Sequence, residues 1–211
     1  MERYVAGRTL VDVGAGPGYL CRIAMEEGWS ATGVEMSSEA TRHGKARFGV
    51  PYSALEDIDD ASVDAVTCHH VLEHVASPPQ FLSLLHRKLK PGGLLVVHVP
   101  HQQPTTFFVR DAVSRRVNPG RDTWCTLYSN IHISGFTLQS LTNVAERAGF
   151  ATHFVRSAGM WTKFYDPFFV MNFVRIRAWK ALARKVIRHG VDTLGTPFGH
   201  GDWVVGYFAK P

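Results

Sequence analysis

The run VDVGAGPGYL, from Val11 to Leu20, contains the turn on which the fold prediction depends. Its first apolar residues predict a buried strand, and the apolar spacing that continues beyond Leu20 predicts a helix. Between them stand Gly14, Gly16 and Gly18, where the absence of Cβ atoms lets the backbone approach a ligand closely. A glycine-rich turn from strand to helix, with free amides, is typical of α/β domains that bind a nucleoside cofactor at the carboxyl ends of their strands.

Downstream of this turn, strand patterns alternate with helix patterns. Seven segments have the pattern of a strand: 9–13, 31–35, 51–55, 63–68, 94–99, 151–155 and 203–208. Several of the segments between them have helical spacing, among them 38–48, 79–89 and a helix capped near Thr137. Repeated steps from strand to helix and continuously apolar strands predict an α/β fold with a Rossmann-like, doubly wound, mostly parallel sheet of seven strands.

The composition is that of an ordinary globular protein. Of the 211 residues, 45% are hydrophobic and 19% charged, and the formal net charge is +5, which together exclude a disordered chain. The apolar runs are far shorter than the ~20 residues that cross a bilayer, and the N-terminus lacks a signal-peptide pattern, so a cytoplasmic protein is expected. Three widely spaced cysteines without a CxxC pair are interpreted as buried thiols. We therefore predict a single domain over residues 1–211.

Two segments depart from the alternating pattern. Residues 100–133 lack a clear period, and so long a connection is usually a lid or a substrate loop. Residues 161–189 have helical spacing and form an insertion before the last strand. Within it, residues 169–188 carry one apolar and one basic stripe, which suit peripheral contact with an anionic membrane or a phosphate-bearing substrate, or packing on the sheet edge. Binding of nucleic acid is less favoured, because no stacking platform accompanies the basic stripe.

An acidic residue, Glu35, closes the second predicted strand. A carboxylate there can accept hydrogen bonds from both ribose hydroxyls of a nucleoside, and capping of the following helix is the alternative role. Dinucleotide-binding proteins have glycines in the pattern GxGxxG, whose last glycine would fall where this chain has Tyr19. That substitution weakens the case for a cofactor with a pyrophosphate, such as NAD.

These residues resemble the class I S-adenosylmethionine-dependent methyltransferases, in which a strand, a DVGxGxG turn and an acidic residue closing the second strand follow one another. VDAVTCHHVLEHVASP (63–78) is similar to the family's fourth-strand segment, and LKPGGLLVVHVP (89–100) to its fifth-strand motif. IHISGFTLQSLTNVAERAGF (131–150) resembles the subgroup related to ubiquinone-biosynthesis O-methyltransferases and other small-molecule enzymes. The resemblance covers residues 9–150 and implies S-adenosylmethionine as the cofactor and an antiparallel last strand.

The resemblance also implies which residues contact the cofactor. Asp12 and the glycine turn would line its methionine part, Glu35 would bind the ribose and Met36 would pack on the adenine. The full set implied for the cofactor is Asp12, Gly14, Ala15, Gly16, Gly18, Tyr19, Glu35, Met36, Leu55, Glu56, His69 and His70. Two features depart from the family: Ala54 stands where many relatives have an acidic residue, and only eight residues precede the first strand, so a covering N-terminal helix is not expected.

Methyl transfer moves CH₃⁺ in line from a sulfonium to a nucleophile, so the protein mainly aligns the reactants and excludes water. An oxygen acceptor also needs a base, and a neutral imidazole is suitable. The candidate catalytic residues are His132, His70 and His101. They fall at the ends of predicted strands or on the approach to the sixth strand of the family that the sequence resembles. His132 is favoured for its match to a histidine in related segments, and a structural hydrogen bond is its alternative role.

One motif points to a different chemistry. His70, Glu73 and His74 spell H-x-x-E-H, which matches an inverted zinc-protease motif. The motif begins directly at the end of a predicted strand, and no third ligand follows on a helix. The sequence therefore predicts no metal.

The sequence thus predicts S-adenosylmethionine-dependent transfer of a methyl group to a small-molecule acceptor, such as a lipid-like compound or a sugar, at oxygen. A non-catalytic, S-adenosylmethionine-binding partner subunit is an alternative, which Ala54 and the absence of a predicted N-terminal helix leave open. An RNA methyltransferase and an NAD-dependent oxidoreductase are the remaining alternatives, and Tyr19 argues against the second.

Overall fold

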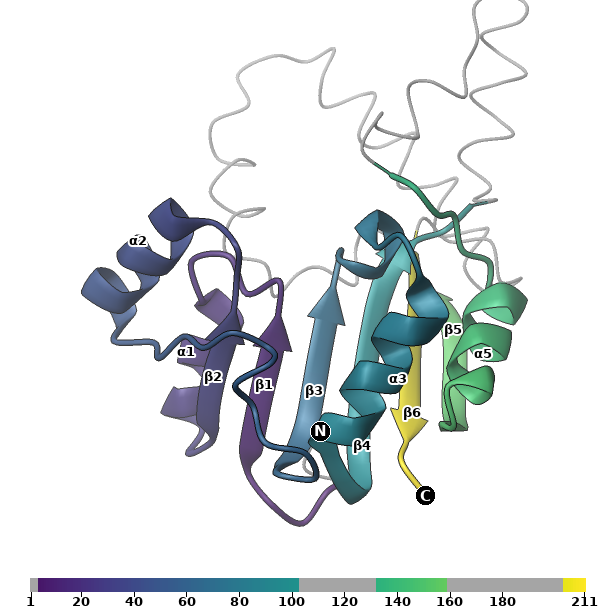
Figure 1. The fold of residues 1–211 in the computed structure, drawn as a ribbon, viewed down its shortest axis with the longest axis horizontal. Helices are drawn as coiled ribbons and strands as arrows, with labels where there is room; N and C mark the ends of the chain where they lie inside the picture. Colours follow the sequence, from purple (N-terminus) through teal and green to yellow (C-terminus); the bar gives the residue numbers. More distant parts are fainter. Residues whose placement is uncertain (1–3, 103–131, 159–202) are drawn as a thin grey trace, which may run out of the picture.

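The computed structural model describes residues 4–102, 132–158 and 203–211 (Figure 1). Six strands in these ranges form one sheet in the order β2-β1-β3-β4-β6-β5. The strands are β1 Thr9–Val13, β2 Ser30–Val34, β3 Val63–His69, β4 Leu89–Pro100, β5 Ala151–Ala158 and β6 Trp203–Ala209. The helices are α1 Tyr19–Glu26, α2 Ser38–Phe48, α3 Pro78–Lys88 and α5 Leu138–Arg147, with a short 3-10 helix η1 at Leu72–His74.

The strand directions confirm the predicted doubly wound α/β fold. β2, β1, β3 and β4 are neighbours that run parallel. β6 is antiparallel to both of its neighbours, β4 and β5, as the resemblance implied for the last strand. The four parallel strands therefore end at one edge of the sheet, which is the upper edge in Figure 1.

The strand predicted at 51–55 is not formed. Only Tyr52 bridges to Gly33, flanked by hydrogen bonds from the Gly33 amide to the Pro51 carbonyl (2.9 Å) and from the Ser53 amide to the Gly33 carbonyl (3.0 Å). The Pro51 nitrogen has no hydrogen to donate, and a turn begins at Ala54, whose carbonyl accepts from the Asp57 amide at 3.2 Å. The pairing therefore ends after one bridge, and the described sheet has six strands where seven were predicted.

Hydrophobic cores cover both faces of the sheet, because alternate residues of a strand point to opposite faces. On one face Val11 packs in a core with Leu82 of α3 and Leu141 of α5. On the other face Leu10 packs with Cys21 of α1. Figure 1 shows α3 and α5 together in front of β4, β6 and β5. The predicted burial of the thiols is confirmed for Cys21 and Cys68, and Cys125 lies outside the described residues.

Local signals explain where two of the helices begin. The hydroxyl of Ser37 accepts a hydrogen bond from the Ala40 amide at 3.2 Å, which caps α2, and α2 ends at Gly49, whose φ of 66° is left-handed. Thr137 and Ser140 form a reciprocal capping box at the start of α5. These caps fix the residues at which α2 and α5 begin.

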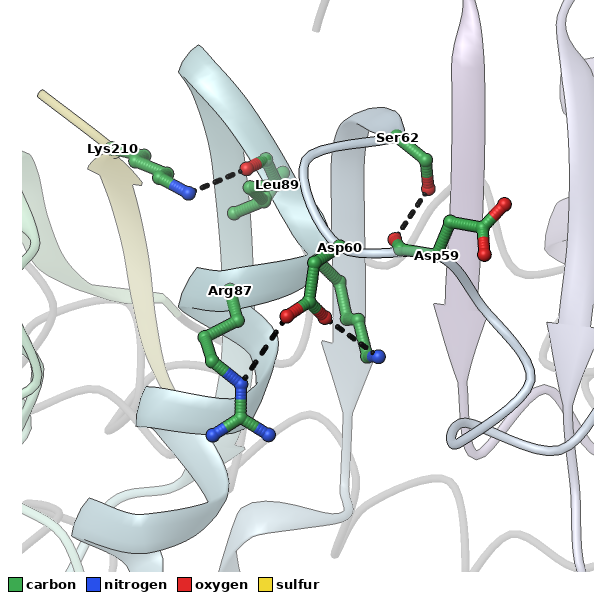
Figure 2. A network of polar contacts seen from close by, with 7 residues as sticks. Asp59, Asp60, Ser62, Arg87, Leu89 and Lys210 are labelled. Carbon is green, nitrogen blue, oxygen red and sulfur yellow. Dashed lines mark hydrogen bonds and ion pairs between the residues drawn. The ribbon is translucent and has the colours of Figure 1, made fainter.

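Ion pairs and hydrogen bonds fasten the opposite edge (Figure 2). The Asp60 carboxylate lies 2.8 Å from the Lys88 amine and 3.7 Å from the Arg87 guanidinium. The Lys210 amine donates to the Leu89 carbonyl at 2.7 Å. These contacts join the beginnings of β3 and β4 to the end of β6. The cationic side chains of Arg87, Lys88 and Lys210 are therefore occupied by contacts within the fold.

Several predictions fall on parts of the chain that are not described. The predicted substrate loop 100–133 is described only at its two ends, and the insertion 161–189, with its basic stripe at 169–188, lies outside the described residues. Across the described ranges, no helix has both the length and the apolar character to cross a bilayer.

Candidate functional site

The glycine turn follows β1 at the carboxyl edge of the sheet. Gly14, Gly16 and Gly18 have φ values of 74°, 52° and 79°, a left-handed conformation that L side chains rarely adopt. A Cβ atom at Gly14 would meet the Val71 side chain, and one at Gly18 would lie 2.7 Å from the Tyr52 hydroxyl. A Cβ atom at Gly16 would have no described atom within 4 Å. Gly14 and Gly18 are therefore needed for packing, whereas the space beside Gly16 is not filled by any described atom.

The expectation that the turn offers free amides is wrong for four of its residues. The amides of Gly14 and Ala15 donate to the Val34 carbonyl at 2.8 and 3.1 Å, and the Gly18 amide donates to the Ala15 carbonyl at 2.9 Å. The Gly16 amide donates to the Glu35 carboxylate at 2.8 Å. Because a pyrophosphate is bound through such amides, their internal use adds to the argument from Tyr19 against a dinucleotide.

Glu35 joins the glycine turn to the start of α2. Its Oε2 accepts from the Gly16 amide and its Oε1 from the Ser37 amide, both at 2.8 Å. The bond from the Ser37 amide fits the alternative role of Glu35, which is capping of the following helix. Capping does not explain the bond from the Gly16 amide. An ionised carboxylate has about four acceptor positions, so ribose hydroxyls can still bind.

Tyr52 is a residue of this region that sequence reasoning missed. Its hydroxyl donates to the Gly16 carbonyl at 3.0 Å, and its ring lies over Gly33 and Gly44, where a Cβ atom would collide with it. The pKa of Tyr52 is raised above its usual value, mainly by desolvation. The phenol therefore stays protonated at neutral pH and holds the turn in place.

Tyr52→Phe removes one hydrogen bond and little packing. We expect the free energy of unfolding to fall by about 0.5–1.5 kcal/mol, the usual net value of such a bond. Urea denaturation of the variant beside Tyr4→Phe, whose ring packs on His153 and Tyr207, measures the loss. An equal effect at both tyrosines would show that the bond to Gly16 adds nothing specific.

Asp12, the predicted contact for the methionine part, is buried at the end of β1. It is 5% exposed, and its Oδ1 accepts from the Thr67 hydroxyl at 2.7 Å. Desolvation raises its pKa to about 6, against a lowering by the Thr67 hydrogen bond, and the negative charge of Glu35 raises it further. A carboxylate of raised pKa beside the glycine turn is a feature of functional sites.

Asp12→Asn tests this raised pKa through the pH dependence of stability. Between about pH 4 and pH 6 the folded protein keeps a proton that the unfolded chain has lost, so ionisation of Asp12 favours unfolding as the pH rises. The asparagine variant lacks this ionisation, and its stability relative to the wild type should increase by on the order of 3 kcal/mol across that window. Urea unfolding of both proteins at each pH checks it, and a difference independent of pH would contradict it.

The remaining residues predicted to contact the cofactor differ in exposure. Met36 is fully exposed beside Glu35, and Leu55 is buried in the core. Glu56 is exposed, and the Tyr19 ring lies 5.2 Å from that of Phe48. Met36 and Glu56 are therefore accessible to a ligand, whereas Leu55 can contribute only through packing.

Imidazole rings gather where β3 and β4 end. His69 is exposed, and its ring lies 5.5 Å from that of His98. His70 has a φ of 56°, its amide donates to the His98 carbonyl at 2.9 Å, and its ring lies 4.7 Å from both His98 and Trp203. A left-handed non-glycine residue is a local strain that often marks functional sites.

Glu73 lies close to His70, one of these histidines. It is 1% exposed, and neither of its carboxylate oxygens accepts a hydrogen bond from the described residues. The nearest nitrogens to Oε1 are His70 Nδ1 at 3.3 Å and His74 Nε2 at 4.0 Å. A buried carboxylate without hydrogen bonds is costly and calls for a positive partner.

The structure brings His132 to the same place. The Glu73 carbonyl accepts from the amides of Ile133 and Ser134 at 2.8 and 3.0 Å, which ties this segment to η1. The ring of His132 lies 4.9 Å from that of His74. Metal-ligating atoms of Glu73, His74 and His132 all lie within 4.8 Å of one another, so these three residues could hold a metal ion.

His101, the third predicted base, lies at the end of β4. It is 6% exposed and bridges to Phe136, whose carbonyl accepts from the Gln102 amide at 2.7 Å. Of the three candidate bases, the structure thus places His70 and His132 around Glu73 and His101 in the neighbouring bridge.

The amino-acid sequence is similar to those of known methyltransferases. The sequence model of a family described as a methyltransferase domain matches residues 3–153. A protein of Mycolicibacterium smegmatis, named "Probable S-adenosylmethionine-dependent methyltransferase", is 30% identical over 150 residues, which are 69% of this chain and 52% of that protein. A ubiquinone biosynthesis O-methyltransferase of Alkalilimnicola ehrlichii is 31% identical over 111 residues, which are 48% of this chain and 45% of that protein.

Solved structures with a similar fold include other methyltransferases. The S-adenosylmethionine-dependent methyltransferase of Mesorhizobium loti is similar with a TM-score of 0.62 at 18% identity, over 98% of this chain and 92% of that one. The chain spans about half the length of the curated relatives named above. Since the family match covers most of the sequence and the sheet, glycine turn and acidic residue agree with it, the chain belongs to the S-adenosylmethionine-dependent methyltransferases.

Proposed function

We propose that this chain binds S-adenosylmethionine at the ends of β1 and β2 and transfers its methyl group to an oxygen of a small molecule. The observation that carries the proposal is the pairing of an open position at Gly16 with the carboxylate of Glu35, joined by one hydrogen bond of 2.8 Å. A nucleoside needs both a surface without side chains and an acceptor for its ribose hydroxyls.

Three residues near the ends of β1 and β2 would contribute to binding of the cofactor in different ways. Gly16 allows close approach of the ligand, Glu35 accepts the ribose hydroxyls and Tyr52 keeps the turn in position. When bound, S-adenosylmethionine supplies an activated methyl group, so the protein needs no covalent intermediate. What remains for the protein is alignment of the two reactants and exclusion of water.

The acceptor would bind near the ends of β3 and β4, beside the bound cofactor. His70 and His98 lie there with the Trp203 ring, a combination of polar and apolar groups that suits a hydroxylated molecule with an apolar or sugar body. The naming of a matched relative as a ubiquinone biosynthesis O-methyltransferase supports oxygen as the attacking atom.

Methyl transfer from labelled S-adenosylmethionine tests the proposal. The protein is offered separate pools of phenolic lipids, sugars, small amines and RNA, and the label is followed by mass spectrometry. We expect labelled product and S-adenosylhomocysteine with a hydroxylated small molecule. Label on amines or RNA alone would contradict the acceptor class, and tight cofactor binding without transfer to any pool would favour the non-catalytic alternative.

A further inference from the structure

Glu73 has a buried carboxylate that accepts no hydrogen bond within the described part of the chain. Both of its oxygens are buried, and the described residues donate no hydrogen bond to either. Folding this carboxylate into the protein is unfavourable unless a cation or a donor compensates it. A metal ion is one such cation, provided that other ligands surround it.

Two imidazoles complete a set of ligands around this carboxylate. His74 follows Glu73 in η1, and His132 is held against η1 by the hydrogen bonds that the Glu73 carbonyl accepts from Ile133 and Ser134. The ligand atoms of Glu73, His74 and His132 lie within 4.8 Å of one another. In a tetrahedral site two atoms bound to one Zn²⁺ at about 2.1 Å lie about 3.4 Å apart, so side-chain rotations that bring the ligand atoms together by up to about 1.4 Å close the set.

We propose that Glu73, His74 and His132 bind a divalent transition-metal ion, for which Zn²⁺ is the best match. Two nitrogens and one carboxylate oxygen favour Zn²⁺ over Mg²⁺, which prefers oxygen ligands. Three protein ligands leave a coordination position for water or another molecule, as in catalytic rather than structural zinc sites. This proposal replaces the sequence-based expectation that the H-x-x-E-H run binds no metal.

His70 supports the same site from outside the set of ligands. Its Nδ1 lies 3.3 Å from Glu73 Oε1, within reach of a hydrogen bond that orients the carboxylate. Partners of this kind are common around metal ligands and tune their affinity. The site adjoins the residues predicted for the methionine end of the cofactor. If the proposed function holds, the open coordination position can therefore take an oxygen of the acceptor.

The metal alone is the probe in the experiment. The full chain is stripped with a chelator and titrated with Co²⁺, whose visible absorption reports nitrogen and oxygen ligation, and then with Zn²⁺ as competitor. We expect one equivalent of Co²⁺ to bind and to be displaced by Zn²⁺ but not by a large excess of Mg²⁺. His132→Ala and Glu73→Gln should weaken Zn²⁺ binding by at least about tenfold.

A surface histidine gives the matched control. His43→Ala lies on α2 at the other end of the sheet and should bind Zn²⁺ as the wild type does. Circular dichroism of each variant shows whether it is folded, and His132→Ala, at a partly exposed position, keeps the test valid if Glu73→Gln does not fold. Absence of Co²⁺ binding by the folded wild type, or unchanged affinity in folded His132→Ala, would overturn the proposal.

A separate titration distinguishes this proposal from the proposed function. S-adenosylmethionine is titrated into the same metal-free protein and into His132→Ala. Binding of the cofactor without binding of metal rejects the metal site and leaves the methyltransferase proposal standing. Binding of metal without binding of cofactor rejects the proposed function and leaves the metal site standing.

Discussion

Gly16→Val should abolish binding of S-adenosylmethionine, with an affinity weaker than about 1 mM in a calorimetric titration. Gly16 has a φ of 52°, and its Cβ direction points into space that no described atom occupies. A valine would place three carbon atoms where we propose that the ligand lies, and its branched side chain would also disfavour the left-handed backbone. Both effects act against binding.

Gly49→Val is the matched control for this variant. Gly49 also has a left-handed φ, of 66°, and a Cβ atom there would likewise meet nothing within 4 Å. It ends α2, away from the glycine turn. Both variants should lose stability for the same backbone reason, and only Gly16→Val should lose the cofactor. Equal cofactor affinity in the two folded variants would place the ligand elsewhere.

Glu35→Ala should weaken S-adenosylmethionine binding by about 1.5–3 kcal/mol, or roughly 10- to 150-fold, because it removes hydrogen bonds to a charged acceptor. The same change removes the bonds that Glu35 accepts from the amides of Gly16 and Ser37. Calorimetry with S-adenosylmethionine and S-adenosylhomocysteine should show the loss for both ligands, since both carry the ribose.

Two further variants separate ribose binding from support of the turn. Tyr52→Phe loosens the turn at the Gly16 carbonyl without touching Glu35, and Glu39→Ala changes an exposed acidic residue in the first turn of α2. Cofactor affinity close to that of the wild type in both would assign the effect of Glu35→Ala to the ribose contact. Wild-type affinity in Glu35→Ala itself would leave Glu35 with the capping role alone.

The fold was predictable where the deciding signals are local. The strand expected at 9–13 coincides with β1, and the helix expected at 38–48 coincides with α2, because Ser37 and Gly49 cap it at either end. The segment 51–55 failed because its few strand-forming residues follow a proline and run into a turn at Ala54. A pattern of residue types does not show how many backbone bonds a short segment will make.

The site was predictable in part for the same reason. Gly16 and Glu35 stand at fixed distances from the ends of β1 and β2, so spacing alone placed them at one edge. Tyr52 was missed because its partners, Gly33 and Gly44, lie in other elements and become its neighbours only in the folded chain. The expected free amides failed because the Val34 carbonyl and the Glu35 carboxylate take up their hydrogen bonds.

The meeting of Glu73 with His132 was beyond the reach of sequence patterns. These residues are far apart in the chain, and backbone bonds from Ile133 and Ser134 to the Glu73 carbonyl bring them together. A search for a third metal ligand on a helix passes over His132, since it lies on a segment without helical structure. Contacts that depend on the path of a long connection require the structure.

Calorimetric titration of the full chain with S-adenosylmethionine, S-adenosylhomocysteine and NAD in parallel identifies the cofactor that the glycine turn and Glu35 bind. The glycine turn, Glu35 and the internal use of the turn amides predict micromolar binding of the first two ligands and none of NAD. Binding of NAD in preference, or binding of none of the three by folded protein, would contradict S-adenosylmethionine as the cofactor of this chain.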